Sequence, residues 1–166
     1  GLDSAGQLRV VGNEFSSDME VGPYGGDPNA ADTRTYNVSK AMLADPILYA
    51  DFQEWPVAQG APWVDADGDG VYSPLPNGPD HPEFVGDQVI WSIQNDAVPT
   101  SKGITGGFPT NVEVRTTMFG FDRPDAFGDI VFMKHAMTNM TDEDITDAYF
   151  GVWVDPDNGK YDADLI

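Results

Sequence analysis

Residues 55–87 constrain the possible folds of this chain more than any other stretch. The run contains six prolines, is rich in glycine and aspartate, and shows no regular spacing of apolar residues. Proline lacks a backbone N–H, so the run cannot form a long helix or a central strand. A stretch of this length without secondary structure needs something to hold it inside a domain. A metal ion is the natural candidate, because coordination bonds would replace the missing backbone hydrogen bonds.

The same run contains an aspartate motif with the spacing of a calcium loop. Asp65, Asp67 and Asp69 alternate with small residues, and Gly70 and Val71 follow. Carboxylates at every second position, closed by the backbone carbonyl of Val71, form the first half of an EF-hand-type loop. The position for the bidentate glutamate of an EF-hand is a proline here, and no helix can follow. We therefore expect a calcium loop outside an EF-hand, the alternative being an acidic turn that uses Asp and Gly for backbone reasons.

Further acids must complete such a calcium site. Asp80 and Asp87 are the nearest in the sequence. The chain also repeats Trp-Val-Asp-x-Asp, first in "WVDADGDGVY" (63–72) and again in "WVDPDNGKY" (153–161). Asp155 and Asp157 of the second copy become candidate ligands if the fold brings the two copies together. The alternative for the second copy is a solvated hairpin turn.

The charge of the chain is strongly negative. Its 28 acidic and 8 basic residues give a formal net charge of −20. Such a chain repels nucleic acid and anionic membrane surfaces, and it attracts divalent cations. The alternative for many of these carboxylates is a solvated acidic surface. Cysteine is absent, which excludes disulfides, zinc–thiolate sites and thiol nucleophiles. No apolar run is long enough for membrane insertion.

The second half of the chain has the patterns of β-strands. Residues 88–96 are a short apolar run, and residues 110–121 and 130–140 alternate apolar and polar side chains. Residues 148–154, "AYFGVWV", predict another strand after a turn. The fold class predicted is mainly β, an antiparallel β-sandwich with long Gly/Pro/Asp-rich calcium-binding loops.

The length of 166 residues and the hydrophobic content of 40% suit one domain, 1–166, or a fragment of a larger chain. Residues 1–54 are expected to be loosely structured, 55–87 to form the acidic calcium region, and 88–166 to supply antiparallel strands. Within the first part, residues 37–55 are the best helical candidate, limited by Pro46. Both ends of the sequence look cut, which suggests a piece of something longer.

The sequence does not indicate an enzyme. It contains no nucleophile elbow and no phosphate-binding loop, and carboxylate pairs arise by chance among so many acids. Trp63 and Trp153 precede the two acidic motifs and are candidate ligand-binding residues. Tryptophans in such places either stack on sugars, as in carbohydrate-binding modules, or pin an irregular loop to the core.

A family resemblance rests on "EWPVAQGAPWVDADGDGVYSP", "GDQVIWSIQND" and "GDIVFMKHAMTN…ITDAYFGVWVDPDNGKYDADLI". These segments, within residues 50–166, resemble a recurring region of large secreted proteins of Bacteroidota and Ignavibacteria, many of which end in a type IX secretion sorting domain. The resemblance implies export through the outer membrane and a β-rich multidomain parent protein. It implies no activity, because the family is largely uncharacterised.

Together these features predict a calcium-stabilised structural or adhesive segment of an exported bacterial protein, located at the cell surface or secreted. Its expected partners are other domains of the parent protein, further copies of itself or glycans. Two alternatives remain open: a glycan-binding or polysaccharide-degrading module, and a self-assembling subunit of an extracellular filament or layer.

Overall fold

A computed structural model describes residues 2–12, 18–97 and 107–152. The described chain is built mainly from antiparallel strands and contains little helix, which confirms the predicted β class. No described helix is both long and apolar enough to cross a membrane. In chain order the elements are β1 (Glu20–Val21), β2 (Tyr36–Ser39), η1 (Lys40–Ala44), η2 (Pro46–Leu48), α1 (Ala50–Gln53), η3 (Val57–Gln59), β3 (Trp63–Val64), β4 (His81–Pro82), β5 (Gln88–Asn95), β6 (Val112–Gly120), η5 (Ala126–Asp129) and β7 (Phe132–Asn139).

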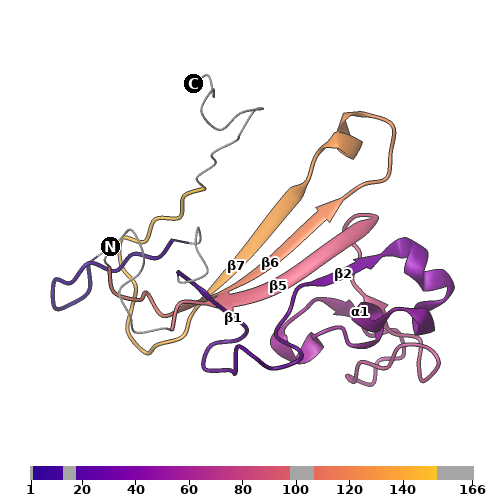
Figure 1. The fold of residues 1–166 in the computed structure, drawn as a ribbon, viewed down its shortest axis with the longest axis horizontal. Helices are drawn as coiled ribbons and strands as arrows, with labels where there is room; N and C mark the ends of the chain where they lie inside the picture. The colour runs from indigo at the N-terminus through magenta and orange to yellow at the C-terminus, as the bar shows by residue number, and fades with distance from the viewer. Residues whose placement is uncertain (1, 13–17, 98–106, 153–166) are drawn as a thin grey trace.

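Strand β5 is the centre of a five-stranded antiparallel sheet (Figure 1). Along one edge it pairs with β6 over its whole length, and β6 pairs in turn with β7. Along the other edge β2 pairs with the first half of β5 and β1 with its last two residues. The remaining strands, β3 and β4, form a separate two-stranded ladder. Strands β5, β6 and β7 therefore run antiparallel in chain order, at the positions of the strands predicted for residues 88–96, 110–121 and 130–140.

The hydrophobic core lies on one face of this sheet. Alternate residues of β5 are buried there, as expected for a strand with one covered face. Short helices and loops from the middle of the chain, including α1, cover that face (Figure 1). The buried core residues are Tyr36, Val38, Phe52, Trp55, Ala61, Val89, Trp91 and Ile93. Tyr36, Trp55 and Trp91 form a cluster of rings whose centroids lie 6.1–6.4 Å apart.

The opposite face of the sheet, which we call the open face, is more exposed. It carries Ile90, Val114, Met118, Met133 and Met137, as the strand register shows. The methionines of β7 are about half exposed, at 55% and 50%. The described residues place no second sheet over this face. The sandwich therefore stays a prediction.

Two expectations for the first third of the chain are wrong. The helix expected within residues 37–55, limited by Pro46 to about two turns, is shorter than expected: residues 37–39 belong to β2, 3-10 turns follow, and α1 has only four residues. Residues 1–54 are also not loosely structured throughout, because Tyr36, Val38 and Phe52 belong to the core. In both cases pairing and packing against β5 decide the local structure.

The predicted strand at residues 148–154 is not formed in its described part. Residues 148–152 lie outside every strand, and residues 153–154 lie outside the described residues.

Candidate metal centre

The acidic loop begins and ends at the β3–β4 ladder. Val64 pairs with His81, and Trp63 pairs with Pro82. Residues 65–80 run out from this ladder and return to it. Gly68 and Gly70 have positive φ angles of 78° each, a conformation that side chains other than glycine rarely adopt. The alternation of aspartate and glycine therefore serves the tight turns of the loop as well as its charge.

Four carboxylates meet in this loop. One oxygen from each of Asp65, Asp67, Asp69 and Asp80 lies within 4.8 Å of the others. The first three side chains are exposed, and Asp80 is buried with 2% of its surface accessible. A cluster of this kind could hold a metal ion. The sequence named all four residues, three from their spacing and Asp80 from its nearness.

Backbone amides of the loop already orient the exposed carboxylates. Asp65 accepts hydrogen bonds from the N–H groups of Gly68 at 2.7 Å and Gly70 at 2.9 Å. Asp69 accepts one from the N–H of Val71 at 2.7 Å. The loop is thus wrapped around its own acidic side chains, which lowers the cost of ordering them around an ion.

Asp80 joins the two ends of the loop. Its oxygens accept hydrogen bonds from the N–H of Ala66 at 2.9 Å and from the N–H of Ser73 at 2.8 Å. The bond from the Ser73 N–H is the main reason that the pKa of Asp80 is lowered, and it outweighs the raising effect of burial. Asp80 therefore stays ionised in the folded chain, and its negative charge is held close to the other three.

The pKa of Asp67 is raised in the folded chain. Desolvation is the largest cause that raises its pKa, and the neighbouring charges of Asp69, Asp80 and Asp65 raise it further. A hydrogen bond from the N–H of Asp69 opposes this effect. A raised pKa means that the folded chain disfavours the ionised carboxylate in the absence of a cation. A bound cation would reverse that preference.

Aromatic contacts attach the loop to the core. The rings of Trp63 and Tyr72 pack edge to face with centroids 5.6 Å apart. The Tyr72 hydroxyl donates a hydrogen bond of 2.7 Å to the backbone oxygen of Phe52 in α1. Burial is the main cause that raises the pKa of Tyr72. Trp63 therefore has the loop-pinning contacts that were one of its two expected roles.

The other candidate ligands are placed differently. Val71, expected to offer its backbone carbonyl, lies two residues after Asp69 and is exposed. Asp87 lies outside the cluster: its carboxylate accepts hydrogen bonds from Lys40 Nζ at 3.2 Å and from the Asp122 N–H at 2.9 Å. Asp155, Asp157 and Trp153 lie outside the described residues.

Trp55 and Trp91 are buried in the core, with 3% and 1% of their surfaces accessible. Neither offers an open ring face for a sugar. A shallow groove of about 430 Å³ does lie beside the loop, lined in part by Tyr72, Glu54 and Asp32.

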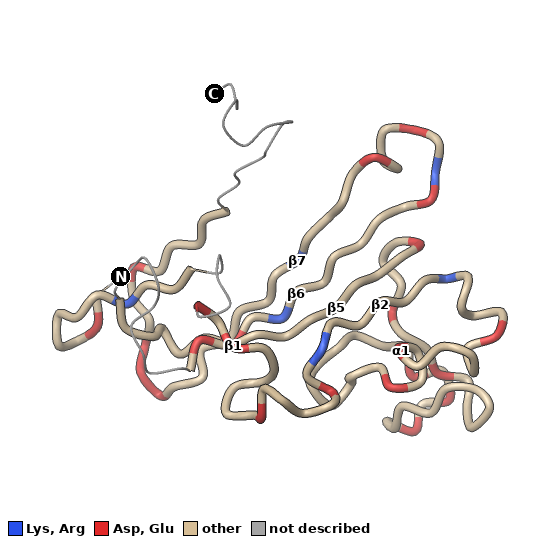
Figure 2. Tube along the Cα trace, in the orientation of Figure 1, with Lys and Arg blue, Asp and Glu red and all other residues tan. Residues whose placement is uncertain are grey.

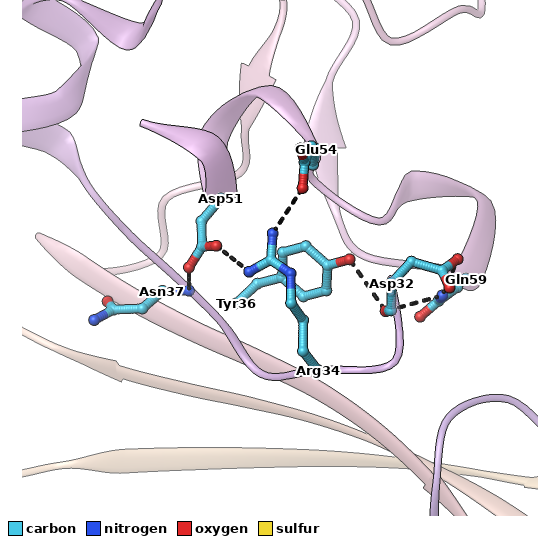
Figure 3. Close-up of polar contacts among 7 residues, drawn as sticks. All are labelled: Asp32, Arg34, Tyr36, Asn37, Asp51, Glu54 and Gln59. Carbon is cyan, nitrogen blue, oxygen red and sulfur yellow. Dashed lines mark hydrogen bonds and ion pairs between the residues drawn. The ribbon is translucent and has the colours of Figure 1, made fainter. Parts of the chain in front are cut away.

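A second polar cluster, which the sequence did not reveal, lies next to this groove (Figure 3). Arg34 stacks on the ring of Tyr36 at 4.0 Å and pairs with Asp51 and with Glu54, the latter at 3.0 Å. Asp51 also accepts a hydrogen bond from the N–H of Asn37 at 2.8 Å. Because the cluster ties α1 to β2 and leaves the arginine paired twice, its contacts are those of a structural anchor. No spacing in the sequence marks residues 34 and 51 as partners.

The fold and the loop define an acidic, antiparallel β protein with a candidate metal centre on an irregular loop. No family model, no curated protein and no solved structure matches this chain.

Proposed function

We propose that this chain is a calcium-stabilised structural or adhesive segment of an exported bacterial protein. The observation that carries the proposal is the convergence of four aspartates on one loop. Calcium binds hard oxygen ligands at about 2.3–2.6 Å, so opposite ligands around one ion are roughly 5 Å apart. Carboxylate oxygens within 4.8 Å of one another suit that size. Backbone carbonyls and water would complete the six to eight ligands that calcium takes.

The role of the ion would be to stabilise the folded chain. An ion that binds only the folded loop stabilises the fold by about 2.7 kcal/mol when its concentration is a hundred times the dissociation constant. It would also neutralise part of a net charge of −20. Exposed carboxylates and an anchor to the core through Tyr72 favour a structural ion over a catalytic one.

The proposed secretion, or location at the cell surface, rests on the family resemblance of residues 50–166. A sandwich completed by other domains of the parent protein would explain the apolar open face.

The test is a melting curve in excess EDTA, in calcium and in magnesium. For a chain of this length we expect calcium to raise the melting temperature by roughly 5–10 °C over EDTA. Magnesium should have a smaller effect, because it prefers octahedral sites that keep several waters. Identical curves in EDTA and calcium would refute the proposal.

A further inference from the structure

The outer edge of β7 is unusually suited to accept another strand. Within the described ranges, β7 pairs with β6 on one side and with no strand on the other. Alternate residues of such an edge point their N–H and C=O groups away from the sheet, which leaves a template for pairing. The strand carries no acid and no proline, and its only formally charged residue is Lys134. It therefore lacks most of the features that protect natural edges.

A short apolar segment of the same chain lies close by. Residues 148–152, "AYFGV", carry no charge and lie outside every strand. Their large side chains are exposed, at 92% for Tyr149, 58% for Phe150 and 65% for Val152. Exposed apolar side chains and an unpaired strand edge are both unfavourable in water. Pairing the two would remove both costs.

The connection between them already reverses the chain. Asn139, the last residue of β7, accepts a hydrogen bond from the N–H of Thr141 at 3.0 Å. Its side-chain amide donates to the backbone oxygen of Glu143 at 2.7 Å. Asp147 has a positive φ of 51°, the left-handed conformation that often ends a turn between two strands. In Figure 1 the chain accordingly turns back after β7.

One contact fixes which side chains would face which way. The rings of His135 and Phe150 lie 5.5 Å apart. His135 pairs with Thr116 and lies on the open face, so Phe150 lies on that face as well. Because side chains alternate along a strand, Ala148 and Val152 would share this face and Tyr149 would point the other way.

We propose that residues 148–152, which lie outside every strand in this structure, are poised to close as an antiparallel strand onto the free edge of β7 of the same chain. The observed ring contact sets the register: Phe150 opposite His135, Ala148 opposite Met137, and Val152 opposite Met133. The apolar side chains of the new strand extend the open face, and the backbone groups at the edge of β7 gain partners.

The strand comes from the same chain and not from a second copy. A short connection gives an effective concentration in the millimolar range, on the order of a thousandfold above that of a second copy at micromolar protein. Association would also bring together two chains of net charge −20 each. Both effects favour closure within one chain.

Cross-linking tests the register directly, because the sequence has no cysteine of its own. The double variant Met133→Cys/Val152→Cys places both thiols on one face. The control Met133→Cys/Gly151→Cys places them on opposite faces. Under mild oxidation the first pair should form a disulfide within the chain at least about tenfold faster than the second, because disulfides need Cβ atoms about 3.5–4.5 Å apart. Circular dichroism establishes that both variants are folded.

Three outcomes of this experiment would overturn the proposal: equal rates for the two pairs, no cross-link in the folded protein, or disulfide dimers as the main product. Dimers would show that the edge accepts a second copy instead.

Amide hydrogen exchange of the unaltered chain provides a measurement that needs no variant. All amides of β7 should be protected, and in Phe150→Asp alternate amides should exchange at least about tenfold faster. Rapid exchange of those alternate amides in the unaltered chain would also overturn the proposal.

Discussion

Asp80 and Asp67 belong to one carboxylate cluster, but different groups surround their oxygens. Asp80 is buried and accepts hydrogen bonds from the backbone N–H groups of Ala66 and Ser73. Asp67 is exposed, and desolvation, followed by the charges of its neighbours, raises its pKa. The first residue therefore holds the loop together without any ion, whereas the ionised carboxylate of the second is disfavoured in the absence of a cation.

This difference predicts opposite behaviour of two alanine variants. In EDTA, Asp80→Ala should lower the melting temperature, because the N–H groups of Ala66 and Ser73 lose their acceptor. In EDTA, Asp67→Ala should be at least as stable as the unaltered chain, since one repelling charge is gone. In calcium, Asp67→Ala should lose most of the calcium-dependent rise. Melting curves of the three proteins in both conditions measure this, and an equal loss for both variants in EDTA would contradict it.

Asp87 predicts a dependence on pH that does not involve the metal. The hydrogen bond from the Asp122 N–H, followed by that from Lys40, lowers the pKa of Asp87. A carboxyl group whose pKa is lower in the folded chain stabilises the fold above its unfolded pKa, and this stabilisation is lost as the pH falls through the folded pKa. In EDTA, Asp87→Asn should therefore be less stable than the unaltered chain at pH 6, and the gap should close below about pH 4.

Urea unfolding at pH 6, 5, 4 and 3 measures the gap. Asp142→Asn, at an exposed turn position, is the control and should change stability little at any of these values. A gap that stays constant, or that widens toward acid, would count against the assigned role of Asp87.

At this scale the sequence predicts clustered carboxylates most directly where their spacing alone brings them together. Asp65, Asp67 and Asp69 alternate within five residues, so any tight turn gathers them. Asp80 was named for its nearness, but its burial and its two amide donors follow from the β3–β4 ladder. Asp87 was named for the same reason, yet its carboxylate, at the start of β5, accepts hydrogen bonds from Lys40 and from the N–H of Asp122. Nearness in sequence does not specify which way a loop turns.

Among the elements, β2 is the strand that the local sequence pattern does not predict. Residues 37–55 contain good helix formers, but Val38 belongs to a strand that pairs with β5 and is completely buried. Pro46 then limits the following residues to short turns. Strands β6 and β7 were predictable because each has its own alternation, and β5 because it is a short apolar run. The place of β2 was not, since it depends on a partner about fifty residues away.

Phe52 in α1 provides a test of how firmly this first part is packed. The ring is 1% exposed, so Phe52→Ala removes a large buried side chain and should cost about 3–5 kcal/mol. Phe127 in η5 is 51% exposed and stacks only on Arg123 at 5.1 Å, so Phe127→Ala should cost less than about 1 kcal/mol. Urea unfolding of both variants gives the comparison, and similar costs would mean that α1 is not part of the core.

On the scale of the whole molecule, the acidic residues lie mostly outside the three long strands of the sheet. Acidic residues gather in loops and turns, whereas β5, β6 and β7 together contain a single one, Glu113 (Figure 2). Net charge could be read from the sequence, but this separation required the strand boundaries. Most carboxylates remain near water, and the sheet keeps two apolar faces, one covered by the core and one open.

The exposure of three of the four clustered aspartates has a consequence for when an ion binds and leaves. An ion can enter or leave such a site without any opening of the fold, so occupancy should follow the surrounding calcium concentration closely. Extracellular calcium modules bind with dissociation constants of about 10⁻⁴–10⁻³ M, well above the range to which cytosolic sensors respond. With that affinity, the proposed export would carry the loop from a compartment in which it stays empty to one in which it fills. Export itself would then supply the final increment of stability.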